Sequence, residues 1–223
     1  MTELYRVVSG STSYGLETPK SDIDYQSIYL NTLIDELRFN TNKEKKNVQH
    51  IDNGQDILST HFNSYLRQLQ QGSFTFLETL FCREEFILHK DTSFDLILQN
   101  RQGLLTQQCV SSIKGHCHRI LKDFVQKEGY EYKGKKLSHA FRLLSYLDQL
   151  KETGAFCTYV SDKDLRSFLL QLKEDKPLDM SLHVKNLKSR LIQLDTISFD
   201  LPPDCVNLVK ELDIQVKTNF YNL

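Results

Sequence analysis

Two aspartates near the N-terminus, Asp22 and Asp24, stand two residues apart and are the first candidates for chemistry. On a β-strand alternate side chains face the same side, so both carboxylates would project together while Ile23 turns into the core. Neighbouring carboxylates repel each other unless a cation lies between them. Hard cations such as Mg²⁺ prefer oxygen ligands and complete their shell with waters and substrate phosphates. The pair therefore predicts a divalent-metal site that acts on phosphates.

A glycine and a serine, Gly10 and Ser11, precede the aspartates by a polar spacer from Thr12 to Ser21. Glycine lets the backbone approach a phosphate closely, and the serine hydroxyl and nearby N–H groups can bind phosphate oxygens. The pattern G-x-x-x-x-G-K-[ST] does not occur in the sequence, so this is not a Walker A loop. We expect Gly10 and Ser11 to bind the phosphates of a nucleotide.

The elements that would position these residues are short strands followed by helices. Residues 5–9, 23–30 and 56–60 have the composition and alternation of strands, and residues 40–47 are expected to form an exposed connection. Apolar residues at helical spacing begin at Phe62, Gly72 ends that run, and Leu77, Leu80 and Phe81 mark a further short helix. From about residue 96 nearly every segment has a helical pattern, broken at the prolines. The fold class is therefore α+β, a small mixed β-sheet followed by a helical C-terminal half.

The spacing of these motifs resembles a known family. Gly-Ser, ten residues and Asp-Ile-Asp are similar to the signature of the DNA polymerase β-type nucleotidyltransferase superfamily. Residues 10–25 resemble its bacterial and phage branch of predicted, RNA-ligase-associated nucleotidyltransferases. Residues 72–81 are similar to that branch's G-N-P-N-x-L-E-x-L segment, although residues 73–75 depart from Asn-Pro-Asn. Residues 135–142 resemble its K-x-x-x-H-x-x-R helix, whereas the last fifty residues match no pattern.

The resemblance implies a catalytic domain at residues 1–100 and a helical domain at residues 101–223 that closes the cleft. It implies a nucleotidyltransferase that uses Mg²⁺, or Mn²⁺, to move a nucleoside monophosphate from a triphosphate such as ATP to a hydroxyl. The acceptor would be an RNA end or a protein, and pyrophosphate would leave. The superfamily often has a third carboxylate, for which Asp56 is the candidate and Asp52 the rival. The alternative is a non-catalytic module that binds a nucleotide or partner on the same fold.

Lys135, His139 and Arg142 share one face of the predicted helix, opposite an apolar stripe that contains Leu137, Phe141 and Leu144. One interpretation is a solvated polar face. The other, which we favour, is a cationic wall that binds the triphosphate, so that its charges matter more for binding than for folding. Glu78 is expected to be structural and to pair with a base near the cleft.

The composition adds weaker constraints. The formal net charge is −1, but Lys114–Arg142 hold eight basic and three acidic residues with Tyr130 and Tyr132 between them. This pattern suits single-stranded nucleic acid, and equally an ordinary soluble surface. The sequence has no apolar run long enough to span a membrane and no secretory signal, and its five cysteines lack a C-x-x-C pair. We therefore expect a cytoplasmic protein with free thiols. His116-Cys117-His118 lacks a second ligand pair at zinc-finger spacing.

Overall fold

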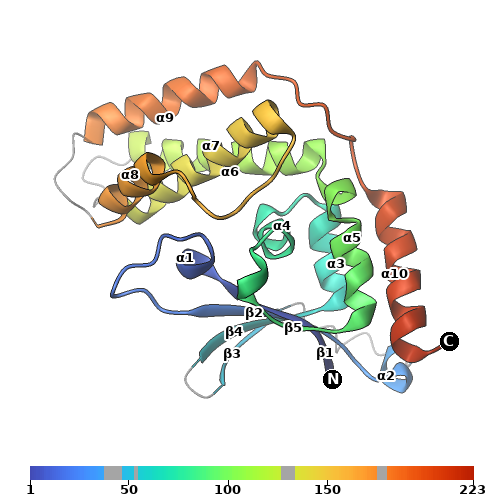
Figure 1. Ribbon diagram of the computed structural model, residues 1–223. Coiled ribbons are helices and arrows are strands. Elements are labelled where there is room, and N and C mark those ends of the chain that lie inside the picture. Colours follow the sequence, from blue (N-terminus) through green and yellow to red (C-terminus); the bar gives the residue numbers. More distant parts are fainter. Residues whose placement is uncertain (38–46, 53–54, 127–133, 175–179) are drawn as a thin grey trace.

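The N-terminal part of the chain forms a five-stranded mixed sheet (Figure 1). The computed structural model describes residues 1–37, 47–52, 55–126, 134–174 and 180–223. In sequence order the strands are β1 (Thr2–Ser9), β2 (Asp24–Leu30), β3 (Asn47–Asp52), β4 (Gln55–His61) and β5 (Ile87–Lys90). Their order across the sheet is β3-β4-β2-β1-β5.

The central pair of the sheet, β2 and β4, is parallel, and the other three pairs are antiparallel. In the parallel ladder Asp24 lies opposite Asp56, and Gln26 lies opposite Leu58. In the antiparallel ladder with β1, Asp24 lies opposite Ser9. The register therefore places two aspartates side by side at the starting ends of neighbouring strands, next to the end of β1.

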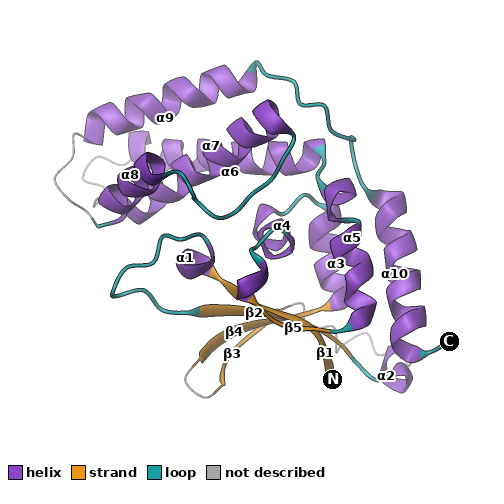
Figure 2. Cartoon of the chain, in the orientation of Figure 1, coloured by secondary structure: helices purple, strands orange, loops and turns teal. Residues whose placement is uncertain are grey.

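Helices cover one face of this sheet and form a further layer above it, as Figure 2 shows in purple over the orange strands. In the described residues they are α1 (Gly10–Ser13), α2 (Leu33–Leu37), α3 (Phe62–Gln70), α4 (Phe74–Leu80), α5 (Asp95–Gln99), α6 (Gln107–Gln126), α7 (Gly134–Thr153), α8 (Lys163–Lys173), α9 (Met180–Asp195) and α10 (Val206–Tyr221). Short 3-10 turns lie at Glu84–Phe86, Thr92–Phe94 and Arg101–Leu104. No helix in these described ranges is long and apolar enough to cross a membrane.

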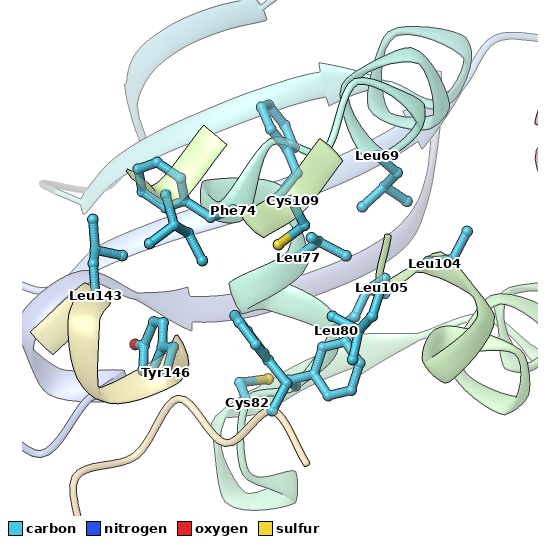
Figure 3. Packing of buried hydrophobic residues seen from close by; sticks show 14 of the residues in the cluster. Leu69, Phe74, Leu77, Leu80, Cys82, Leu104, Leu105, Cys109, Leu143 and Tyr146 are labelled. Carbon is cyan, nitrogen blue, oxygen red and sulfur yellow. The ribbon is translucent and has the colours of Figure 1, made fainter. Parts of the chain in front are cut away.

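The hydrophobic core is continuous from the sheet to the outer helices. Helix α4 lies at its centre, and Figure 3 shows Leu77 of α4 among Leu69 of α3, Cys109 of α6 and Leu143 of α7. All four side chains are fully buried. The short segment from 74 to 80 therefore packs against both the sheet layer and the helical half.

The last helix, α10, returns to the N-terminal half and lies beside α3 and α5 (Figure 1). Its Tyr221 hydroxyl donates a hydrogen bond of 2.7 Å to the Asn31 carbonyl. Of the segment that matched no pattern in the sequence, α10 thus packs on α3 and α5 in the N-terminal half, whereas α9 packs on α6 and α7. Both halves of the chain share one hydrophobic core. The division into two domains at about residue 100 therefore stays a prediction.

The α+β class and the helical C-terminal half are confirmed, and the three expected strands correspond to β1, β2 and β4. Strands β3 and β5 were not predicted, and Gly10–Ser13 forms a helical turn instead of entering a loop directly. The expectation for Ile23 was wrong. Strand β2 begins only at Asp24, so Asp22 and Ile23 precede it, and the Ile23 side chain is half exposed. Most of the expected connection at residues 40–47 lies outside the described residues.

Gly72 ends α3 with a φ of +70°, and a Cβ at this position would come within 2.5 Å of the backbone of α6 at Cys109. Gly72→Ala should therefore lower the free energy of unfolding by about 2–4 kcal/mol, through a left-handed conformation and overpacking. Gly115→Ala is the matched control, because a Cβ at Gly115 in α6 meets no atom within 4 Å. It should be neutral or stabilise by up to about 1 kcal/mol. Equal urea midpoints for the two variants would contradict the close approach.

Candidate active site

A cavity of about 290 Å³ lies between the sheet, α1 and α4, above the starting ends of β2 and β4. The strands supply its floor and the two short helices supply its opposite wall. The lining residues are Val8, Ser9, Gly10, Ser13, Tyr14, Asp24, Tyr25, Gln26, Asp56, Leu58, Thr75, Glu78 and Thr79. The cavity therefore gathers residues from five elements around one pair of aspartates.

Asp24 and Asp56 both line the cavity and are direct neighbours in the parallel ladder. Partial burial raises the pKa of Asp24, and the negative charges of Asp56 and Asp22 also raise it, while the Lys135 ammonium lowers it. Asp22 is exposed and does not line the cavity, but it is near enough to act on Asp24 electrostatically. The rival Asp52 ends β3, and its side chain lies outside the described residues. The structure thus brings Asp22, Asp24 and Asp56 into one acidic group.

Gly10 is required here for a reason that the sequence did not show. Its φ is +69°, and a Cβ at this position would overlap the Oδ2 atom of Asp24. The space left by the missing side chain is therefore occupied by a carboxylate. Ser11 does not line the cavity, whereas Ser9 and Ser13 do. The Ser13 hydroxyl donates to the Gly10 carbonyl at 2.9 Å and closes the turn.

The segment between Gly10 and Asp22 is held from α8 in the helical half. Arg166 donates to the Gly15 carbonyl at 2.5 Å. Lys173 donates to the Leu16 carbonyl at 2.7 Å and contacts the Ser21 hydroxyl at 3.2 Å. These two basic residues were not identified from the sequence, because their partners are backbone carbonyls about 150 residues away. They hold in place the spacer that connects Gly10 and Ser11 to Asp22 and Asp24.

Tyr14, directly after α1, is fixed by a buried ion pair. Arg142 of α7 donates to Glu78 Oε1 of α4 at 2.5 Å, and both side chains are at most 4% exposed. The Tyr14 hydroxyl donates to Glu78 Oε2 at 2.7 Å, and the Arg142 guanidinium lies 3.6 Å from the centre of the Tyr14 ring. Arg142 also donates to the Tyr146 hydroxyl. We call Tyr14, Glu78 and Arg142 the clamp, since they tie α1, α4 and α7 together.

None of the three residues of the predicted cationic wall lines the cavity. Lys135 is exposed and acts on Asp24, whereas His139 is largely buried and its Nδ1 lies 3.0 Å from the Arg142 guanidinium. Helix α7 buries residues on both sides, including Leu143 and Tyr146. Neither interpretation therefore fits Arg142, which is buried and paired with Glu78 instead of facing solvent or the cavity, so the expectation that its charge matters little for folding was wrong. The expectation that Glu78 pairs with a base is confirmed, and that base is Arg142.

Two other sequence features are the His116-Cys117-His118 run and the interleaved tyrosines of the basic segment. Cys117 is buried, His118 contacts Asp195 at 2.9 Å, and His116 contacts Arg119 at 2.8 Å, so the three side chains diverge. Tyr130 and Tyr132 lie outside the described residues.

Comparison with known proteins decides the family. A family model described as RlaP, RNA repair pathway DNA polymerase beta family, matches residues 2–187. The chain belongs to this family. The expected relationship to the DNA polymerase β-type superfamily is thereby confirmed, and membership indicates nucleotidyl transfer as the general chemistry.

More distant comparisons add little. No curated protein matches the chain. Among solved structures, a nucleotidyltransferase-like protein from Exiguobacterium sibiricum 255-15 is 11% identical, with a TM-score of 0.31 over 99% of this chain and 73% of that one. Such a score supports no detailed correspondence.

The donor set of this RlaP family member suits a hard cation. Asp24 and Asp56 lie side by side on neighbouring strands, and the pKa of Asp24 is raised first by partial burial and then by the negative charge of Asp56, which a cation would offset. Within the described ranges no group of three or more His, Cys, Asp or Glu side chains is arranged so that it could hold a metal ion. Waters and substrate phosphates would have to supply the remaining ligands, as they commonly do for Mg²⁺.

The clamp leads to a stability prediction for this RlaP family member. Arg142→Met should lower the free energy of unfolding by about 3–5 kcal/mol, because it leaves the Glu78 carboxylate buried without its cation. Arg119→Ala on the exposed side of α6 is the control and should change stability by no more than about 0.5 kcal/mol. Chemical denaturation of both variants measures this. A change of less than about 1 kcal/mol for Arg142→Met would show that the clamp does not hold the helices together.

His139 should make stability depend on pH. Burial, with the nearby Arg142, His116 and Lys135, lowers its pKa to about 3, whereas an unfolded chain has a histidine pKa of about 6.5. As the pH falls from 6.5 towards 3, only the unfolded state takes up this proton, so stability is lost. Between pH 7.5 and 5.0 the wild type should lose about 1–2 kcal/mol more than His139→Gln.

The matched control for that comparison is His89→Gln, because the His89 ring is exposed on β5. This variant should keep the pH slope of the wild type. Identical slopes for the wild type and His139→Gln in urea unfolding would contradict a buried, neutral imidazole.

Proposed function

We propose that the chain is a Mg²⁺-dependent nucleotidyltransferase that moves a nucleoside monophosphate from a nucleoside triphosphate to a hydroxyl acceptor. The observation that carries the proposal is the pairing of Asp24 with Asp56 at the edge of a cavity, against Gly10. Membership of the RlaP family supports the general chemistry. Pyrophosphate is the second product.

Asp24 and Asp56 would hold the cation, with Asp22 as a further carboxylate near them. When bound, Mg²⁺ supplies positive charge to phosphate oxygens that would otherwise be repelled by the aspartates, and Mn²⁺ could replace it. Asp56 is preferred over Asp52 as the third carboxylate, because its side chain lines the cavity.

The chain's own residues position the triphosphate. Gly10, Ser9 and Ser13 line the cavity, and Ser11, which does not, is less well placed for this role. The Lys135 ammonium stands near Asp24 and can neutralise a phosphate there. His139 and Arg142 act on the site indirectly. Arg142 contacts the Tyr14 ring and pairs with Glu78, and through them it supports the motif. Arg142 is in this view a positioning residue.

In the reaction an acceptor hydroxyl oxygen attacks the α-phosphorus. A new oxygen–phosphorus bond forms as the bond from the α-phosphorus to the bridging oxygen breaks, and pyrophosphate leaves with that electron pair. The hydroxyl proton passes to a carboxylate of the aspartate group. Orientation and charge neutralisation account for most of the rate enhancement in such transfers.

The acceptor is proposed to be a hydroxyl at an RNA end, because the description of the family names an RNA repair pathway. A protein hydroxyl is the competing acceptor. Transfer of label from an α-labelled triphosphate to RNA or to protein in the same mixture separates the two.

Asp24→Asn and Asp56→Asn should each abolish transfer of label from an α-labelled triphosphate in Mg²⁺, because each removes a cation-binding carboxylate. Without metal, their melting temperatures should equal or exceed that of the wild type, since repulsion between the aspartates is relieved. Asp200→Asn is the control, because that aspartate is exposed and does not line the cavity.

Near-full activity in either cavity variant would overturn the metal-site assignment. Triphosphate binding by the wild type without transfer to RNA or protein would favour the non-catalytic binding module instead. The control variant should keep wild-type activity throughout.

A further inference from the structure

One buried amide in the cavity has no partner. The Gln26 side chain is 3% exposed and lines the cavity, and its Nε2 makes no hydrogen bond to any described residue. The other buried polar side chains of the cavity wall do have partners. Ser13 donates to Gly10, Thr79 donates to Phe76, and both Glu78 oxygens accept hydrogen bonds from the clamp.

An unsatisfied buried amide is uncommon in native proteins and destabilises the folded state, so it needs an explanation. Gln26 follows Asp24 by two residues on β2, and both side chains therefore project from the same face of the strand. The two Cα atoms are about 6.6 Å apart along a strand. The free donor thus lies one step further into the cavity than the proposed cation site.

The charges around the cavity indicate what this donor would bind. The lining includes Asp24, Asp56 and Glu78, and none of the described lining residues is Lys, Arg or His. A phosphate next to Gln26 would therefore lack a cationic partner on the cavity wall. Leu58, the ladder neighbour of Gln26, adds an apolar surface. This inner end suits an uncharged group that carries a hydrogen-bond acceptor.

We infer that Gln26 Nε2 donates a hydrogen bond to a neutral oxygen or nitrogen acceptor on the nucleoside part of the substrate nucleotide. The inference rests on the proposed function, because it assumes that the phosphates bind at Asp24 and Asp56. Gln26 is then a substrate-binding residue, whose donor is satisfied only in the complex. The acceptor belongs either to the sugar or to the base.

Gln26→Met tests this, because methionine fills similar space without a donor. In the ligand-free protein the melting temperature should stay the same or rise, since an unsatisfied polar group is removed. Affinity for the best-binding nucleoside triphosphate in Mg²⁺, measured by calorimetry, should fall roughly five- to ten-fold. Affinity for inorganic tripolyphosphate in Mg²⁺ should change less than about two-fold, because it has no nucleoside. Gln26→Leu serves if the methionine variant does not fold.

The matched control is Ser27→Ala, because the Ser27 hydroxyl donates to Glu3 at 2.5 Å and does not line the cavity. It should lower the melting temperature and leave both affinities unchanged. Under the inference, Gln26→Met therefore loses nucleotide affinity without losing stability, whereas Ser27→Ala loses stability without losing affinity. Comparing each triphosphate with its 2′-deoxy form, and then across the four bases, assigns the acceptor to the sugar or the base.

A lower melting temperature for Gln26→Met with unchanged nucleotide affinity would overturn the inference and make the amide structural. An equal loss of tripolyphosphate affinity would overturn it too, by placing the donor on a phosphate. These results leave the proposed function standing. If the wild type binds no triphosphate in Mg²⁺, the proposed function itself fails, and the Gln26 assignment fails with it.

Discussion

The parallel pairing of β2 and β4 forces two carboxylates together. Hydrogen bonds along the ladder fix the backbone of Asp24 opposite that of Asp56, so these two positions cannot move apart without breaking the sheet at its centre. Their repulsion is unfavourable unless a cation is present. The rest of the site depends on this constraint. Gly10 leaves room for the Asp24 carboxylate, and the cavity opens directly above the pair.

The helical half holds the motif in place through contacts with the backbone and one tyrosine. Arg166 and Lys173 bind carbonyls in the spacer between Gly10 and Asp22, and the clamp fixes Tyr14 at the end of α1. In this arrangement most of the basic residues near the site support the polypeptide instead of facing the cavity. Lys135 is the exposed exception among the three residues of the predicted wall.

The polar groups of the cavity divide into two kinds. Glu78, Thr79 and Ser13 are satisfied within the protein and give the cavity its shape. Gln26 keeps an unpartnered buried donor, and the exposed Asp24 carboxylate is acted on by the like charges of Asp56 and Asp22. Preorganised groups of the second kind lower the free energy of a bound ligand because they do not have to break internal bonds first. Charge repulsion and an unpaired amide therefore point to the same part of the cavity.

The sequence by itself determined the local features. Alternation predicted β1, β2 and β4, helical periodicity predicted the C-terminal half, and the spacing of Gly10, Asp22 and Asp24 predicted the family. These signals depend on residues close together in the chain, for which spacing is sufficient.

Only the tertiary structure decided which side chains meet across long separations. The Asp24–Asp56 register and the Glu78–Arg142 pair join residues up to 64 positions apart. The unpartnered Gln26 amide likewise became visible only from the packing around it. The periodicity of α7 predicts one polar face because it measures amphipathicity, and it does not show how many neighbours surround a helix. Because α7 is buried on both sides, Arg142 forms an internal ion pair instead of the predicted phosphate-binding face, since a buried guanidinium needs a carboxylate partner.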